Sequence, residues 1–292
     1  MLAGILIVMT ALLGGAAAGA EGFENSNPVF DARGDRIVFY SNRSGRFQLY
    51  SMDLDGCDVE RLRSSSDEEH YPSLSPDGSR LLFSARRGDA ASDVFVWTLG
   101  SEDLHQLTHD PATDTGPKWS PDGEWIAFES RRGGNADIYI VRPDGSQLRR
   151  ITRHRGNDLS PAWHPDGERL AFQSSRSGNY QIYEVTLEEG ARPVLLLASP
   201  RHLVTPAYAP DAGAIAYAED FGEGNTEIML HEFETGRVRR LTGHQAADFA
   251  PAWSPDGSQL VFMSRRSGEW DVFRIGVHAD SEPVRLTYGS PN

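Results

Sequence analysis

A segment of 44 or 45 residues is repeated six times along the chain, and this repeat constrains the fold more than any other feature. Each repeat begins at a proline, and the spacings between successive prolines are 44, 45, 44, 45 and 45 residues. The six prolines are Pro28, Pro72, Pro117, Pro161, Pro206 and Pro251. A period of this length is typical of solenoids, propellers and related arrays, in which each repeat is one supersecondary unit.

Each repeat contains four short runs rich in β-branched and aromatic residues, which is typical of strands. A P-D-G turn follows the first run in most repeats; proline presets φ there and glycine accepts the left-handed conformation. The later runs include Ile126-Ala127-Phe128, Asp137-Ile138-Tyr139 and Arg240-Leu241-Thr242. Four antiparallel strands per repeat form one propeller blade, whereas the rungs of a linear β-solenoid are much shorter. The sequence therefore predicts an all-β, six-bladed β-propeller in which each blade comes from one contiguous repeat.

The N-terminus has the features of an export signal. Residues 2–13 are almost all apolar, and residues 14–20 are small and end in Ala18-Gly19-Ala20. This pattern predicts a signal peptide over residues 1–20, which leaves residues 21–292 as the propeller. An uncleaved membrane anchor is the alternative, but the apolar run is shorter than the roughly 20 residues that a bilayer requires. We expect a periplasmic or secreted protein.

Charge and cysteine content exclude several kinds of partner. The formal net charge is −14, which argues against nucleic acid, because phosphate binding requires a concentrated basic surface. It also argues against docking on anionic lipid after removal of the signal peptide. The single cysteine, Cys57, cannot form an internal disulfide, so it is a free thiol or an intermolecular bridge. We expect a monomer.

The repeat motif resembles that of a known family. P-x-W-S-P-D-G, followed by I-A-F-x-S-x-R-x-G, D-I-Y and R-R-I-T, resembles the WD-like repeat of the TolB propeller family. The resemblance covers residues 27–287, and residues 117–152 and 251–287 match best. It implies an exported propeller that binds another protein near the cell envelope. Full-length TolB carries an α/β domain before its propeller. Only about seven residues separate the predicted cleavage site from the first blade here, so we expect the propeller without that domain.

Two sets of charged residues recur on one side of the predicted propeller. Strand alternation places the loops before the repeat prolines and the S-x-R-x-G hairpins on one face, called face one, and the P-D-G and D-G turns on face two. Three residues before the prolines stand Asn25, Glu69, Asp114, Asp158, Leu203 and Asp248. The matching hairpin positions are read as Arg43, Arg86, Arg132, Arg176, Asp220 and Arg266.

These two sets admit two interpretations. In the functional one, the acids line the mouth of the channel and hold a cation or a basic partner segment, while the arginines bind carboxylates. In the structural one, acids and arginines pair with each other and fix each hairpin to a neighbouring loop. Blade five has Leu203 and Asp220 at the two positions, and this joint loss favours pairing.

Blade five is also where the repeat departs from its consensus. Its hairpin carries Asp220, Phe221 and Glu223, and His202 lies in the preceding loop. A repeat that abandons the shared pattern is released from the shared structural role. We therefore predict that these four residues contact a partner.

Catalytic and metal-binding signatures are weak. His109, His154 and His244 lie in loops near the acidic positions but on different blades, so we interpret them as solvated loop histidines and predict no cofactor or metal. The recurrent Trp119, Trp163 and Trp253 predict inter-blade core rather than a sugar-stacking platform. There is no G-x-S-x-G, P-loop or dinucleotide fingerprint, so no catalytic residue is predicted.

The leading hypothesis is thus a protein-binding platform in the periplasm or cell envelope. The alternatives are a propeller-based carbohydrate-active enzyme, a lyase or hydrolase with a divalent cation in the channel, and a purely structural scaffold.

Overall fold

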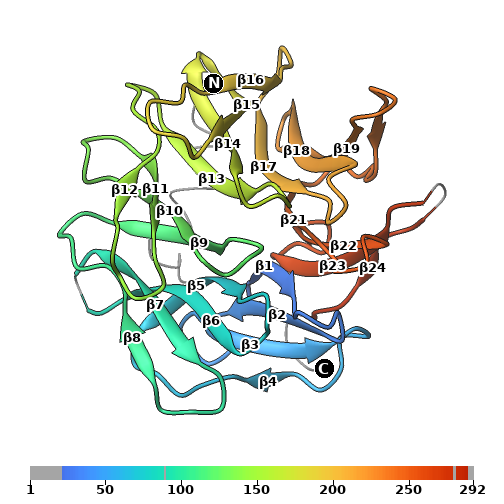
Figure 1. Ribbon diagram of the computed structural model, residues 1–292. Helices are drawn as coiled ribbons and strands as arrows, with labels where there is room; N and C mark the ends of the chain where they lie inside the picture. Colours follow the sequence, from blue (N-terminus) through green and yellow to red (C-terminus); the bar gives the residue numbers. More distant parts are fainter. Residues whose placement is uncertain (1–21, 89, 279–280, 289–292) are drawn as a thin grey trace.

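The fold is a six-bladed β-propeller. The computed structural model describes residues 22–88, 90–278 and 281–288 of the 292-residue chain. Six four-stranded antiparallel sheets are arranged around a central axis (Figure 1), and the described residues contain no helix. No described segment is thus a helix that could cross a membrane. The architecture confirms the prediction from the repeat, while the predicted signal peptide lies outside the described residues.

The four strands of each blade follow one another from the axis outward. The innermost strands are β1 (Asn25–Phe30), β5 (Glu68–Leu74), β9 (Asp114–Trp119), β13 (Asp158–Trp163), β17 (Leu203–Tyr208) and β21 (Asp248–Trp253). The second strands are β2 (Arg36–Ser41), β6 (Arg80–Arg86), β10 (Ile126–Ser130), β14 (Arg169–Ser177), β18 (Ala214–Gly222) and β22 (Gln259–Ser264). The third strands are β3 (Gln48–Asp53), β7 (Ser92–Thr98), β11 (Asp137–Val141), β15 (Asn179–Thr186), β19 (Asn225–Glu232) and β23 (Asp271–Gly276). The outer strands are β4 (Glu60–Arg61), β8 (Leu104–Gln106), β12 (Arg149–Arg150), β16 (Val194–Leu197), β20 (Val238–Arg240) and β24 (Val284–Arg285).

Each sheet comes from one contiguous repeat, as predicted, because the strand order within every sheet follows the sequence. Blades one and six are therefore joined without exchange of a strand. The backbone N–H of Asn25 donates to the carbonyl of Trp270 at 2.7 Å, and the Asn25 Nδ2 donates to Asp271 Oδ1 at 3.1 Å. These bonds add to packing of β1 against β21 and β22 at the junction.

The core lies within and between the blades. A phenylalanine at one position of the second strand is fully buried in five blades, and blade five has Tyr217 there. Trp119 packs against Val94 and Val96 of the preceding blade, and Trp163 packs against Ile138 and Ile140 in the same way. The prediction that the tryptophan positions form inter-blade core is thus confirmed.

Every innermost strand contains a β-bulge at its proline. The ladder shifts register there in all six blades, because proline has no N–H to donate and a bulge accommodates the gap. The residue before each proline adopts a positive φ, and these residues are Asn27, Tyr71, Gly116, Ser160, Thr205 and Ala250. The left-handed region favours glycine, yet only blade three has one at this position. The bulge turns these residues toward the axis.

Candidate functional site

The acids and arginines of face one pair inside the blades. The Arg176 guanidinium donates to both carboxylate oxygens of Asp158, at 3.0 and 2.9 Å. The equivalent distances are 2.6 Å in the Arg132–Asp114 pair and 2.7 Å in the Arg266–Asp248 pair. We call these three the rim pairs. In blade one, Arg43 donates to the Asn25 side-chain oxygen at 2.8 Å.

The rim pairs are enclosed by the blade. All three aspartates are fully buried, and the Arg176 guanidinium also stacks on the Tyr183 ring, 4.6 Å from its centroid. Burial raises the pKa of Asp114 and of Asp248, and the charge of the neighbouring arginine offsets part of that rise. The rim carboxylates are not among the residues that line the channel. Their geometry is that of the pairing interpretation.

The structure corrects the reading of the arginine positions in two blades. Arg87 and Phe221 occupy these positions, one residue later in the chain than the sequence indicated. Arg86 is still paired in the ladder opposite Glu68, and Asp220 is still paired opposite Thr226. Arg87 stacks on the Phe95 ring at 4.8 Å as the rim arginines stack on theirs.

Blade two also forms its acidic pairs differently. Glu69, which is fully buried, accepts a hydrogen bond at 2.5 Å from Arg63 in the loop before the strand. Arg86 instead pairs with Glu68. The Glu69 carboxylate is thus neutralised from a different direction than Asp114 or Asp158.

Blade five also places an arginine against an aromatic ring and a carboxylate, but these groups come from other positions than in the rim pairs. The Phe221 ring lies under two guanidinium groups, Arg201 at 4.6 Å and Arg240 at 4.9 Å. Arg201 also pairs with Glu219 at 3.4 Å. The aromatic ring now stands where the arginine stands elsewhere, and the arginine comes from the preceding loop. Phe221 therefore has a packing role.

The other predicted residues of blade five differ in how they are held. The His202 Nδ1 accepts a hydrogen bond from the Tyr180 backbone N–H at 3.0 Å, so this ring fixes a loop. Asp220 accepts the Gly222 N–H at 2.8 Å within the hairpin. Glu223 lies at the exposed tip, with a φ of 56°. Of the four, Glu223 is the side chain most available to a partner.

Two of the three loop histidines form local hydrogen bonds. His154 and His244 each accept a backbone N–H from two residues further along the chain, at 2.9 and 3.0 Å. Within the described residues, no group of three or more His, Cys, Asp or Glu side chains is arranged to hold a metal ion. Cys57 is exposed and unpaired.

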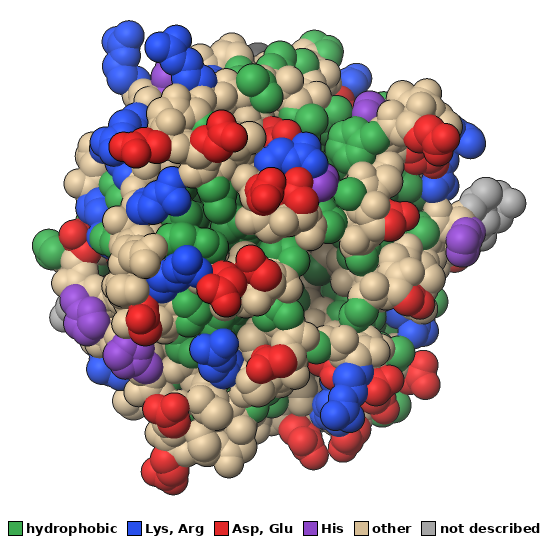
Figure 2. Space-filling view, in the orientation of Figure 1, with side chains coloured by type: hydrophobic (Ala, Val, Ile, Leu, Met, Phe, Trp, Pro, Cys, Tyr) green, Lys and Arg blue, Asp and Glu red, His purple; other side chains and the backbone are tan. Residues whose placement is uncertain are grey.

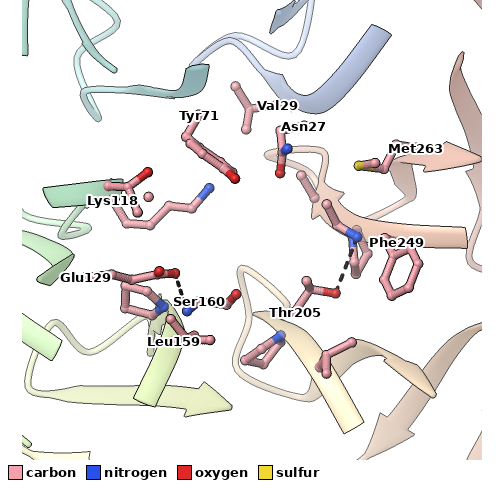
Figure 3. Close-up of a pocket in the computed structure, with 18 of the residues that line it drawn as sticks. Asn27, Val29, Tyr71, Lys118, Glu129, Leu159, Ser160, Thr205, Phe249 and Met263 are labelled. Carbon is pink, nitrogen blue, oxygen red and sulfur yellow. Dashed lines mark hydrogen bonds between the residues drawn. The ribbon is translucent and has the colours of Figure 1, made fainter. Parts of the chain in front are cut away.

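A cavity of about 170 Å³ lies in the channel, lined by the innermost strands of all six blades (Figure 3). The space-filling view, in the orientation of Figure 1, shows a hollow near the centre with hydrophobic side chains around it (Figure 2). Its wall is polar on one side, where Asn27, Tyr71, Lys118 and Glu129 lie, with Arg131 exposed among the lining residues. The lining also contains a set of apolar side chains, which are Leu159, Val204, Phe249, Ala250, Ala252 and Met263.

Sequence reasoning missed these channel residues, although a signal was present. The residues directly after the repeat prolines are Val29, Ser73, Lys118, Ala162, Ala207 and Ala252. Lysine is the exception in a set of small or apolar residues. Lys118 is moreover the only lysine in the chain; every other basic residue among the 28 Lys and Arg is an arginine.

The two charged groups of the polar wall are perturbed by burial. Burial lowers the pKa of Lys118 to about 8, and the charge of Glu129 offsets part of that effect. Burial raises the pKa of Glu129 to about 7, partly offset by a hydrogen bond from the Ser160 N–H at 2.7 Å and by the charges of Arg131 and Lys118. Both groups therefore change charge near neutral pH.

Comparison with known proteins identifies the type of propeller. Residues 89–226 match the family described as the tricorn protease N-terminal β-propeller domain, and residues 184–292 match the TolB β-propeller domain. The chain is 33% identical over 120 residues to the protein TolB homolog of Chlorobium luteolum, an alignment that covers 40% of this chain and 26% of the relative. It is 30% identical over 80 residues to the Tol-Pal system protein TolB of Alcanivorax borkumensis, covering 27% and 18%.

A solved structure supports the same fold. The crystal structure of TolB from Acinetobacter baumannii superposes with a TM-score of 0.71 at 20% identity, over 96% of this chain and 67% of that one. The fold and the repeat thus define a propeller of the tricorn and TolB type. Within that class, the chain is a TolB-like β-propeller. It spans about a quarter or less of the length of those two curated relatives.

Proposed function

We propose that this chain is an exported TolB-like propeller that binds a protein partner in the cell envelope, as a monomer and through face one. The observation that carries the proposal is its similarity to TolB homologues, one of which is named as a protein of the Tol-Pal system. The apolar N-terminal segment, which predicts export, supports the same location. The proposal requires no cofactor.

The distribution of acids on face one supports blade five as the contact region. In blades three, four and six, the rim aspartates are buried under arginines and are not available to a partner. Glu223 is exposed at the blade-five hairpin, and it forms no ion pair within the described part of the chain. An exposed carboxylate at a hairpin tip favours a partner segment that carries Lys or Arg.

Charge reversal at the hairpin tests this proposal. We expect Glu223→Lys, alone or with Asp220→Lys, to reduce capture of a partner from an envelope extract, because it replaces attraction by repulsion. Glu234→Lys is the matched control, since Glu234 is exposed in the β19–β20 turn of the same blade on face two. Equal capture by wild type, Glu223→Lys and the double variant would contradict the contact region.

Metal analysis of the purified protein separates the enzymatic alternative. A stoichiometric divalent cation, lost on joint replacement of Asp114, Asp158 and Asp248 by asparagine in a folded variant, would favour a carbohydrate-active enzyme over a binding platform. We expect these replacements to affect folding stability instead, because each aspartate neutralises a rim arginine.

A further inference from the structure

The charge balance of the channel is opposite to that of the whole protein. Two cationic side chains, Lys118 and Arg131, and one carboxylate, Glu129, line the cavity. The formal net charge of the chain is −14. Because the protein walls around the cavity have low polarizability, a small local excess of positive charge acts more strongly on a ligand inside than it would in bulk water. The cavity is therefore suited to an anion.

The Lys118 ammonium is unsatisfied in the cavity. It points into the same space as Glu129 (Figure 3), but among the residues that the structure describes no ion pair within 4.0 Å joins the two, and the Lys118 Nζ donates no hydrogen bond to the protein. One oxygen of Glu129 is instead held by the Ser160 N–H at 2.7 Å. An enclosed ammonium without a protein acceptor requires water or a ligand.

The fold does not require a lysine here. Five blades place valine, serine or alanine at this position and form the same innermost strand and the same bulge. The Lys118 side chain therefore adds a desolvation cost that the other blades avoid. A ligand that pairs with the ammonium offsets this cost. Ligand binding therefore explains the lysine, whereas the architecture of the blade does not.

The apolar part of the lining selects the rest of the ligand. Met263 of blade six lies across the cavity from Lys118 (Figure 3), and Leu159, Val204 and Phe249 of blades four, five and six also belong to the lining. An apolar cavity of about 150 Å³ admits benzene, so the present space of about 170 Å³ holds an apolar body of about five to seven carbon atoms. Glu129 disfavours a second negative charge on the ligand.

We propose that the channel binds a small monocarboxylate with an apolar body, whose carboxylate accepts hydrogen bonds from Lys118 and whose body packs on Met263 and the other apolar residues of the lining. Arg131 adds positive charge from a more exposed part of the same lining. This site goes beyond the proposed envelope function and does not depend on it, because it lies inside the channel and not at the blade-five hairpin.

Calorimetric titration with four probes tests the ligand chemistry. We expect 4-methylpentanoate to bind more tightly than 4-methylpentanamide, which keeps the body without the charge. Acetate lacks the body, and methylsuccinate carries a second carboxylate, so both should bind at least tenfold more weakly than 4-methylpentanoate. Equal affinity for all four probes, or no detectable binding of 4-methylpentanoate, would overturn the proposal.

Variants assign the contacts. Lys118→Met should weaken 4-methylpentanoate binding by about tenfold or more, the effect of losing one charge-assisted hydrogen bond, and leave the amide unchanged. Met263→Ala should weaken both. Arg192→Met is the control, because it removes one exposed positive charge between β15 and β16, outside the cavity lining. An unchanged affinity in Lys118→Met, or an equal loss in the control, contradicts the assignment.

A measurement on the wild-type protein keeps the test independent of variant folding. Because Lys118 is the only lysine, protein labelled with ¹³C at the lysine ε-carbon contains a single lysine signal. Saturating 4-methylpentanoate should shift this signal and raise its titration midpoint, since a bound carboxylate stabilises the ammonium form. A signal that does not respond to 4-methylpentanoate would rule out contact with Lys118.

Discussion

The rim pairs and the channel wall both contain charged side chains inside the propeller, but the two regions differ in how these charges are paired. In the rim, each buried aspartate meets an arginine of its own blade at 2.6 to 2.9 Å, and the arrangement recurs in three blades. In the channel, Lys118 and Glu129 occur in blade three only, and neither forms an ion pair with another residue in the described part of the chain. A pair that recurs in several blades has a structural role within each blade. A charged group that occurs once, unpaired and facing a cavity, is free to serve a ligand.

The largest expected effect comes from breaking a rim pair. Arg176→Met leaves the fully buried Asp158 without its partner, which costs about 3–5 kcal/mol in the free energy of unfolding. Urea denaturation measures this loss. The double variant Asp158→Asn/Arg176→Met should recover most of it, because the uncompensated charge is gone. A loss below about 1 kcal/mol in the single variant would mean that the rim pairs are not structural.

Neutralising the Glu129 carboxylate should raise the free energy of unfolding instead of lowering it, and the increase should depend on pH. Because burial raises the pKa of Glu129 from 4.5 to about 7, its contribution to stability is full below about pH 4.5 and is lost as the pH rises through 7. Glu129→Gln should nearly match wild type at pH 4 and be more stable at pH 8 by about 3 kcal/mol.

The glutamine should retain the hydrogen bond from the Ser160 N–H, as Gln173 accepts the Thr205 N–H one blade later at 2.8 Å. Thermal unfolding at the two pH values is the measurement. A stability difference independent of pH would show that the Glu129 carboxyl titrates normally and that the channel does not desolvate it.

The smallest expected effect is a difference in unfolding free energy between variants of two equivalent tryptophans. The Trp163 Nε1 donates to the Lys118 carbonyl at 3.1 Å, whereas the buried Trp119 Nε1 has no acceptor among the described residues. Trp163→Phe should therefore cost about 1 kcal/mol more than Trp119→Phe, since only the former breaks a hydrogen bond. Equal losses in urea denaturation would assign the effect to packing alone.

The fold could be predicted from the sequence because the information is repeated six times. Turn glycines, apolar triplets and inter-blade tryptophans recur at fixed offsets, so an accidental resemblance in one repeat is corrected by the others. The pairing of Asp158 with Arg176 could be anticipated in the same way. The reading failed at Arg86 and Asp220, where the hairpin differs by one residue and only the ladder register shows that Arg87 and Phe221 occupy the position.

The channel site could not be predicted in this way, because it depends on what the six repeats enclose together. By itself, the sequence determined a six-bladed all-β propeller with contiguous blades, since local strand and turn preferences suffice for that. The tertiary structure alone decided that bulges at the prolines turn one residue of each blade toward the axis, and that Lys118 and Glu129 line a cavity together with apolar side chains from other blades. The physical reason is that burial, and with it the pKa and the unmet hydrogen bond of a charged group, is a property of its three-dimensional surroundings and not of its position in a repeat.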